Sequence, residues 1–153
     1  LLEDRKLNVE NAMERLIAQR VIPIINENDT VAIDELELEV GENDSLAAVV
    51  ATIAKADLLI IMSDIDGLYD KDPHKEKDAK FIHVVHEITE DIKALAGGVT
   101  TKFGTGGMVT KINAVEIAYE AGIDVVIMNG KQPEKLYDLF DNKDVGTLFC
   151  CNK

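Results

Sequence analysis

Residues 43–62 read NDSLAAVVATIAKADLLIIM, a helical pattern that leads directly into a short apolar run. The apolar residues of the first part share one face of a helix: Leu46, Val49, Val50 and Ile53. Residues 58–62 are continuously apolar, as in a strand that is buried on both faces. Residues 21–25 form an earlier run of the same kind, so the order is strand, helix, strand. This order predicts an α/β fold with a parallel sheet.

The rest of the chain continues this alternation. We expect further helices at residues 9–17, 89–95, 108–119 and 133–140. We expect a third buried strand at residues 123–128, a last strand at 146–149, and one half-exposed arm of a hairpin within 31–40. The polar residues 63–80 predict a surface excursion with a short strand at 68–70. No repeat or linker interrupts the series, so a single domain is the simplest interpretation.

The composition excludes several classes of protein. Of the 153 residues, 46% are hydrophobic and 29% are charged, and no apolar run approaches the roughly 18–20 residues of a membrane span. With 16 Lys and Arg against 29 Asp and Glu, the net charge of −13 disfavours nucleic acid as a partner. The adjacent Cys150 and Cys151 suit neither a disulfide framework nor a zinc site, and His83 and His86 lack a third ligand. We therefore expect no side-chain metal site and a cytoplasmic location.

Three polar clusters occupy places where a strand ends or a helix begins, and ligands bind at such places in open α/β sheets. The first, Asn-Glu-Asn-Asp at residues 26–29, is either a plain turn or a site for a small zwitterion whose ammonium group pairs with Asp29. The second, residues 41–45, is by itself better explained as a helix cap formed by Asn43 or Asp44. An aspartate held at a helix start also stays ionised and could orient lysines around a phosphate.

The third cluster, residues 102–111, combines glycines with two lysines before a helix. Glycines let backbone N–H groups approach an anion, the helix start adds partial positive charge, and Lys111 adds a full charge. The segment differs from a P-loop, because Thr110 stands where that motif has glycine, and a plain glycine-rich turn is the alternative. In so acidic a chain we favour phosphate binding. The loop at residues 63–73 would then contact a nucleotide base or ribose.

Together these segments resemble the amino acid kinase family. The resemblance rests on residues 21–29, 41–46, 63–69, 72–73, 104–111 and 146–149. It implies a three-layer α/β/α sandwich with a mainly parallel central sheet and with its N-terminal part absent. Residues 1–153 would then be a partial amino acid kinase domain, comprising the nucleotide-binding portion and part of the amino-acid pocket.

The resemblance also implies a reaction and the residues that take part in it. The γ-phosphoryl group of Mg-ATP would pass to the side-chain carboxylate of L-glutamate, giving glutamyl 5-phosphate for proline biosynthesis. Asn26, Asp29 and Asn43 would contact glutamate, and Asp44 would organise the catalytic lysines, including Lys111. Mg²⁺ would be held chiefly by the phosphates. The residues implied for the ATP site are Ser63, Asp64, Thr105, Gly106, Gly107, Met108, Val109, Thr110 and Lys111.

Two other functions stay open. The chain could belong to another kinase of the superfamily, acting on N-acetylglutamate, aspartate or UMP, or to a nucleotide-binding module without turnover. Kinases of this kind also begin with a Lys-Leu-Gly-type turn whose lysine contacts the transferring phosphate, and that motif does not occur in these residues. We therefore expect that sequence precedes Leu1, that residues 1–153 alone are inactive, and that the full-length protein is a homo-oligomer.

Overall fold

The computed structural model describes residues 3–26, 43–73, 75–98 and 107–151. Its helices are α1 (Glu3–Ala18), α2 (Asn43–Ile53), α3 (Glu90–Gly98), α4 (Gly107–Glu120) and α5 (Lys135–Phe140). Its strands are β1 (Leu58–Ser63), β2 (Leu68–Tyr69), β3 (Phe81–Ile82), β4 (Val84–Val85), β5 (Asp124–Asn129) and β6 (Thr147–Phe149).

Four of these strands form one mixed sheet in the order β1-β5-β6-β4. β1 and β5 are parallel and pair from Leu58 opposite Asp124 to Ser63 opposite Asn129. β6 runs antiparallel to β5 and parallel to β4, so two of the three pairings in this sheet are parallel. The expectation of an α/β fold with a mainly parallel sheet is confirmed. β2 and β3 form a separate antiparallel hairpin.

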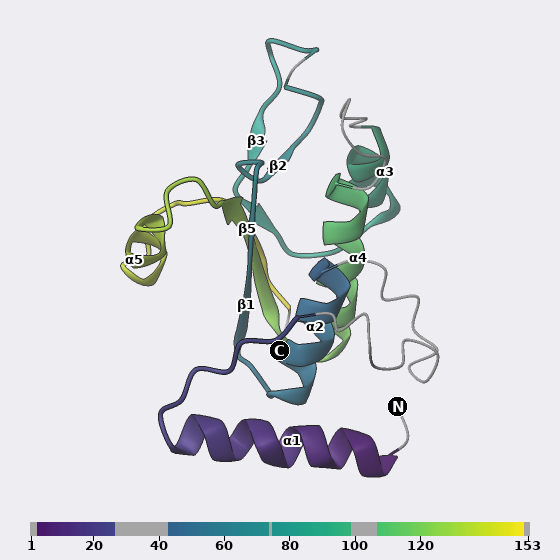
Figure 1. Ribbon diagram of the computed structural model, residues 1–153. Helices are drawn as coiled ribbons and strands as arrows, with labels where there is room; N and C mark the ends of the chain where they lie inside the picture. Colours follow the sequence, from purple (N-terminus) through teal and green to yellow (C-terminus); the bar gives the residue numbers. More distant parts are fainter. Residues whose placement is uncertain (1–2, 27–42, 74, 99–106, 152–153) are drawn as a thin grey trace.

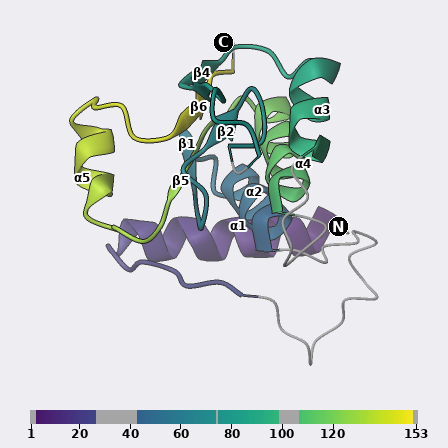
Figure 2. The same ribbon diagram turned by 90° about the horizontal axis from the view of Figure 1, so that it is seen from above.

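The helices form layers on the two sides of the sheet. α2, α3 and α4 lie on one side and α5 on the other, while α1 crosses the lower end of the molecule (Figure 1). The view from above shows the same three layers (Figure 2). The core lies between the sheet and the α2–α4 layer, where Ala48, Val115 and Ile127 are fully buried. Within the described residues, no helix is long and apolar enough to cross a membrane.

Most elements appear where the sequence predicts them. α2 begins at Asn43, α4 is followed by Gly122 with a positive φ of 74°, and Thr89 accepts a hydrogen bond from the N–H of Ile92 at the start of α3. The short strand expected at residues 68–70 is β2. β3 and β4, of two residues each, were not expected as strands. The hairpin arm expected within residues 31–40 lies outside the described residues.

The expectation of a buried strand at residues 21–25 is wrong for this structure. The segment has no regular secondary structure, and the side chains of Ile22 and Ile24 are 86% and 95% exposed. An apolar run becomes an interior strand only where neighbouring strands pair with it and both faces are covered. Among the described residues no strand pairs with this segment, and Pro23 also lacks the N–H that a ladder needs.

β1 is a strand as expected, but it is not buried on both faces. Leu59 and Ile61 are buried, whereas Met62 on the opposite face is 38% exposed. β1 is the edge strand of the sheet described here, and the α2–α4 layer covers only one of its faces. The alternation of more and less buried side chains along β1 therefore arises because only one face of this strand is covered.

Thr147 joins the hairpin to the sheet. Its side chain is fully buried, accepts a hydrogen bond from the N–H of Leu68 at 2.8 Å and donates one to the carbonyl of Ile82 at 2.6 Å. One hydroxyl thus connects β6 with both strands of the hairpin. Gly67 makes room for this contact, because a Cβ at that position would lie 2.5 Å from the Thr147 hydroxyl oxygen.

We expect Thr147→Val to lower the free energy of unfolding by about 1–3 kcal/mol, because it leaves a buried N–H and a buried carbonyl without partners. Chemical denaturation of the 153-residue polypeptide measures the change. Thr147→Ser keeps the hydroxyl and should recover most of the loss. Destabilisation by Thr147→Ser with little change in Thr147→Val would show that the threonine methyl group, and not its hydrogen bonds, matters here.

Candidate functional site

The starts of α2 and α4 meet through one carboxylate. Asp44, in the first turn of α2, accepts a hydrogen bond from the Lys111 ammonium of α4, with 3.0 Å between Oδ2 and Nζ. The same oxygen accepts a hydrogen bond of 3.0 Å from the Thr110 hydroxyl. The side chains of Lys111 and Asp44 are only 11% and 21% exposed, so water screens this pair less than a surface ion pair.

This end of the molecule favours an anion. The first turns of α2 and α4 present partial positive charge, which adds to the charge of Lys111. A Cβ placed on Gly107, the first residue of α4, would meet no atom within 4 Å among the described residues. At this position the described residues leave space for a ligand beside the first residue of α4. A phosphate group would find backbone donors and a nearby ammonium here.

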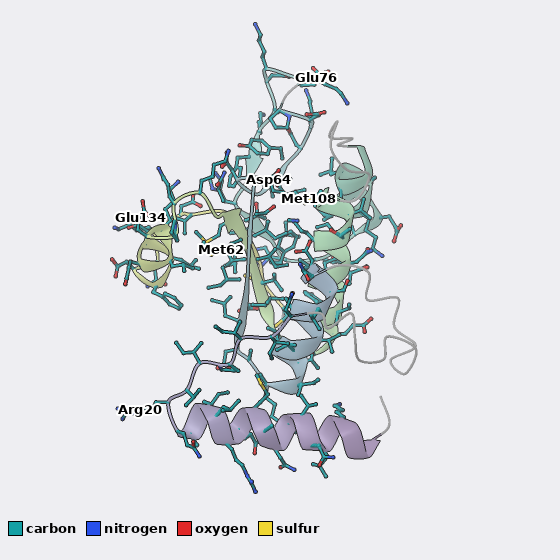
Figure 3. The ribbon with its side chains drawn as sticks, in the orientation of Figure 1. Arg20, Met62, Asp64, Glu76, Met108 and Glu134 are labelled. Carbon is teal, nitrogen blue, oxygen red and sulfur yellow. The ribbon has the colours of Figure 1, made fainter. Side chains whose placement is uncertain are left out.

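The end of β1 lies at the same end of the molecule. Asp64, just after β1, and Met108, in the first turn of α4, both lie near the upper end of the sheet in the orientation of Figure 3. The Ser63 hydroxyl donates to the Asp64 carboxylate at 3.0 Å, and the N–H of Gly130 donates to the Ser63 carbonyl at 2.7 Å. The second bond ties the turn after β1 to the residues after β5.

Asn129 is part of this arrangement and was missed in the sequence. Its side-chain amide donates to the Asp66 carboxylate at 2.7 Å, and its side-chain oxygen accepts from the N–H of Lys131 at 2.9 Å. It thereby holds the loop after β1 against the turn after β5. The signal was present, since Asn129 is the first polar residue after the buried run at 125–128.

A cavity of about 220 Å³ lies beside this loop, with Asp66, Tyr69, Asn129 and Lys135 among its lining residues. Burial raises the pKa of the Tyr69 phenol, and the nearby Asp66 carboxylate raises it further. The phenol therefore stays protonated at neutral pH and can donate a hydrogen bond. Tyr69 also packs edge-on against Phe81, with 5.1 Å between ring centroids. The cavity thus combines an aromatic wall with polar groups.

Residues expected to contact the amino-acid substrate are only partly described. Asn26 and Asn43 line one cavity of about 510 Å³, together with apolar residues such as Leu46 and Leu59. The structure therefore brings these two amides to a shared cavity from segments far apart in the chain. Asp29 lies outside the described residues, as do Thr105 and Gly106 of the expected ATP site.

The described residues provide no metal cage. No group of three or more His, Cys, Asp and Glu side chains among them converges in a way that could hold a metal ion. His83 instead pairs with Asp144, with 2.5 Å between Nδ1 and Oδ2, beside the cavity that contains Tyr69.

Residues 2–129 match the sequence profile of the amino acid kinase family. Because this match covers more than half of the 153 residues, the chain belongs to the amino acid kinase family.

Two curated relatives match nearly the whole of this chain. The chain is 47% identical over 153 residues to a glutamate 5-kinase of Clostridium perfringens, and the match covers 99% of this chain and 57% of the relative. It is 52% identical over 147 residues to a glutamate 5-kinase of Clostridium tetani, covering 96% of this chain and 54% of the relative. The chain thus spans about half the length of these relatives.

Solved structures support the fold. UMP kinase from Ureaplasma parvum superposes with a TM-score of 0.59 at 18% identity, covering 92% of this chain and 52% of that one. N-acetylglutamate synthase from Neisseria gonorrhoeae gives a TM-score of 0.53 at 22% identity, covering 72% and 23%. At these identities the likeness concerns the fold alone.

Proposed function

We propose that these residues form the nucleotide-binding portion of a longer kinase that phosphorylates the side-chain carboxylate of L-glutamate. The product is glutamyl 5-phosphate, in the first step of proline biosynthesis, and the enzyme acts in the cytoplasm. The observation that carries this proposal is the contact of Asp44 with Lys111 and Thr110, which sets a lysine close to the start of α4. Close similarity to glutamate 5-kinases over nearly the whole chain supports the choice of substrate.

In this proposal the triphosphate of ATP lies over the start of α4. Backbone N–H groups of residues 105–109 bind its oxygens, while Ser63 and Asp64 flank it from the end of β1. Lys111 neutralises the charge that develops on the transferring phosphoryl group. Asp44 keeps Lys111 aimed at that position. Mg²⁺ enters as part of the MgATP substrate and is held mainly by phosphate oxygens.

The acceptor is the side-chain carboxylate of glutamate. One of its oxygens forms a bond to the γ-phosphorus as the bond from that phosphorus to the bridging oxygen of ADP breaks. The carboxylate is already ionised at neutral pH, so no general base is needed. The protein therefore contributes position and charge. Asn26 and Asn43 donate hydrogen bonds to glutamate, and Asp29 pairs with its ammonium group.

We expect the longer chain to phosphorylate L-glutamate in preference to N-acetylglutamate, aspartate and UMP, measured as ADP release with each acceptor. The reason is that the proposed pocket presents a carboxylate, Asp29, to a free ammonium group, which N-acetylglutamate and UMP lack, while the side-chain carboxylate of aspartate is one methylene short of the position that glutamate reaches. The 153-residue polypeptide is the matched control and should show no transfer. Preferred turnover of another acceptor, or tight ADP binding without any transfer, would contradict the proposal.

Lys111→Ala in the longer chain should reduce kcat by at least about 100-fold, the scale for losing one preorganised charge at the transition state. The KM for glutamate should change little, because Lys111 acts at the phosphoryl group. Lys131→Ala serves as the control, since that exposed lysine lies after β5. Steady-state kinetics with both substrates varied gives these constants. Near-normal kcat would remove Lys111 from the mechanism.

Asp29→Ala should act on binding. A carboxylate paired with the substrate ammonium stabilises the ground state and the transition state alike, so we expect a raised KM for glutamate with little change in kcat. ADP affinity, measured by calorimetry, should be retained. Loss of ADP binding with an unchanged KM for glutamate would show that the two pockets are assigned to the wrong parts of the chain.

A further inference from the structure

The carboxylate of Asp44 accepts hydrogen bonds from two side chains that differ in flexibility. The Lys111 ammonium reaches it on a flexible four-carbon stem, whereas the Thr110 hydroxyl reaches it from a short β-branched side chain. Both distances are 3.0 Å and both end on Oδ2. Because only one rotatable bond separates the Thr110 hydroxyl from the backbone, its hydrogen bond ties the carboxylate to α4 independently of where Lys111 points.

The Thr110 hydroxyl has a second acceptor within reach. The carbonyl of Gly107, one turn earlier in α4, lies 3.4 Å away, compared with 3.0 Å for Asp44 Oδ2. A hydroxyl has one proton to donate, and a bond to an ionised carboxylate is shorter and stronger than one to a neutral carbonyl. The geometry therefore favours Asp44 as the partner.

We infer that Thr110 is a positioning residue: its hydroxyl holds the Asp44 carboxylate in place so that Lys111 can leave and regain it without the carboxylate turning away. This inference rests on the proposed function, in which Lys111 contacts the transferring phosphoryl group. When Lys111 turns toward that group, its bond to Asp44 lengthens or breaks. The bond from Thr110 remains, and Asp44 keeps the position from which it aims the ammonium.

A substitution that changes polarity and keeps the shape tests the inference. Thr110→Val removes the hydroxyl and keeps the β-branched form, and Thr110→Ser keeps the hydroxyl. Thr52→Val is the matched control, because the Thr52 hydroxyl donates to the Ala48 carbonyl at 2.9 Å within α2 and makes no contact with Asp44. Thermal midpoints of the three variants report any general loss of stability.

The first readout needs no glutamate. Acetylation of Lys111 by acetic anhydride, followed by mass spectrometry, measures how often the ammonium leaves Asp44. We expect Thr110→Val to raise the Lys111 acetylation rate at least about threefold relative to Lys131, with Thr110→Ser and Thr52→Val close to the parent protein. An unchanged rate in Thr110→Val, or an equal rise in Thr110→Ser, overturns the inference.

The second readout is kinetic and uses the longer chain. We expect Thr110→Val to lower kcat about tenfold, the scale of a hydrogen bond to a charged group, with KM for ATP within about twofold. Thr110→Ser should restore most of kcat. On a Lys111→Ala background Thr110→Val should have no further effect, because Thr110 acts through Lys111. An unchanged kcat in Thr110→Val, or an additive loss in the double variant, overturns the inference.

The two readouts separate this inference from the proposed function. A parent protein that phosphorylates none of the acceptors would refute the glutamate kinase assignment. The change in the Lys111 acetylation rate would then decide by itself whether the Thr110 hydroxyl holds the Asp44 carboxylate in place.

Discussion

The parallel pairing of β1 with β5 is the constraint on which the candidate site depends. Residue-by-residue pairing from Leu58 with Asp124 to Ser63 with Asn129 brings both strands to an end at the same edge of the sheet. Each strand is preceded by a helix that packs on the same face, so α2 and α4 must both begin near that edge. Asp44 and Lys111 meet because of this shared starting edge, although 67 positions separate them in the chain.

The local sequence pattern was enough to predict those helices and strands that other described residues bury. The helix from Asn43 and the strand at residues 123–128 both contribute apolar residues to the same buried core, so their sequence patterns predict them well. Residues 21–25 are equally apolar, but hydrophobicity alone does not determine which other parts of the chain will bury a segment. The segment is exposed here, because pairing depends on partners far away in sequence.

The sequence predicted which residues lie at the strand ends and helix starts of the candidate site. It did not predict the contacts between them. Sequence reasoning suggested that Asp44 could orient a lysine, and the structure shows Lys111 beside it. The part played by Thr110 could not be predicted, because it depends on the rotation of α4 about its own axis. Asn129 was missed although it follows the same rule as Ser63, since both end parallel strands at one edge.

The position of β6 has a consequence for the order in which the sheet can assemble. β6 comes after every other strand in sequence, yet it lies between β5 and β4. As the chain leaves the ribosome, β4 can have no place in this sheet until residues 147–149 have emerged. Until then the hairpin also lacks its Thr147 contact. Before residues 146–149 are available, β1 and β5 can pair, but the β2–β3 hairpin and β4 remain without their partners in the sheet, and apolar surface stays exposed.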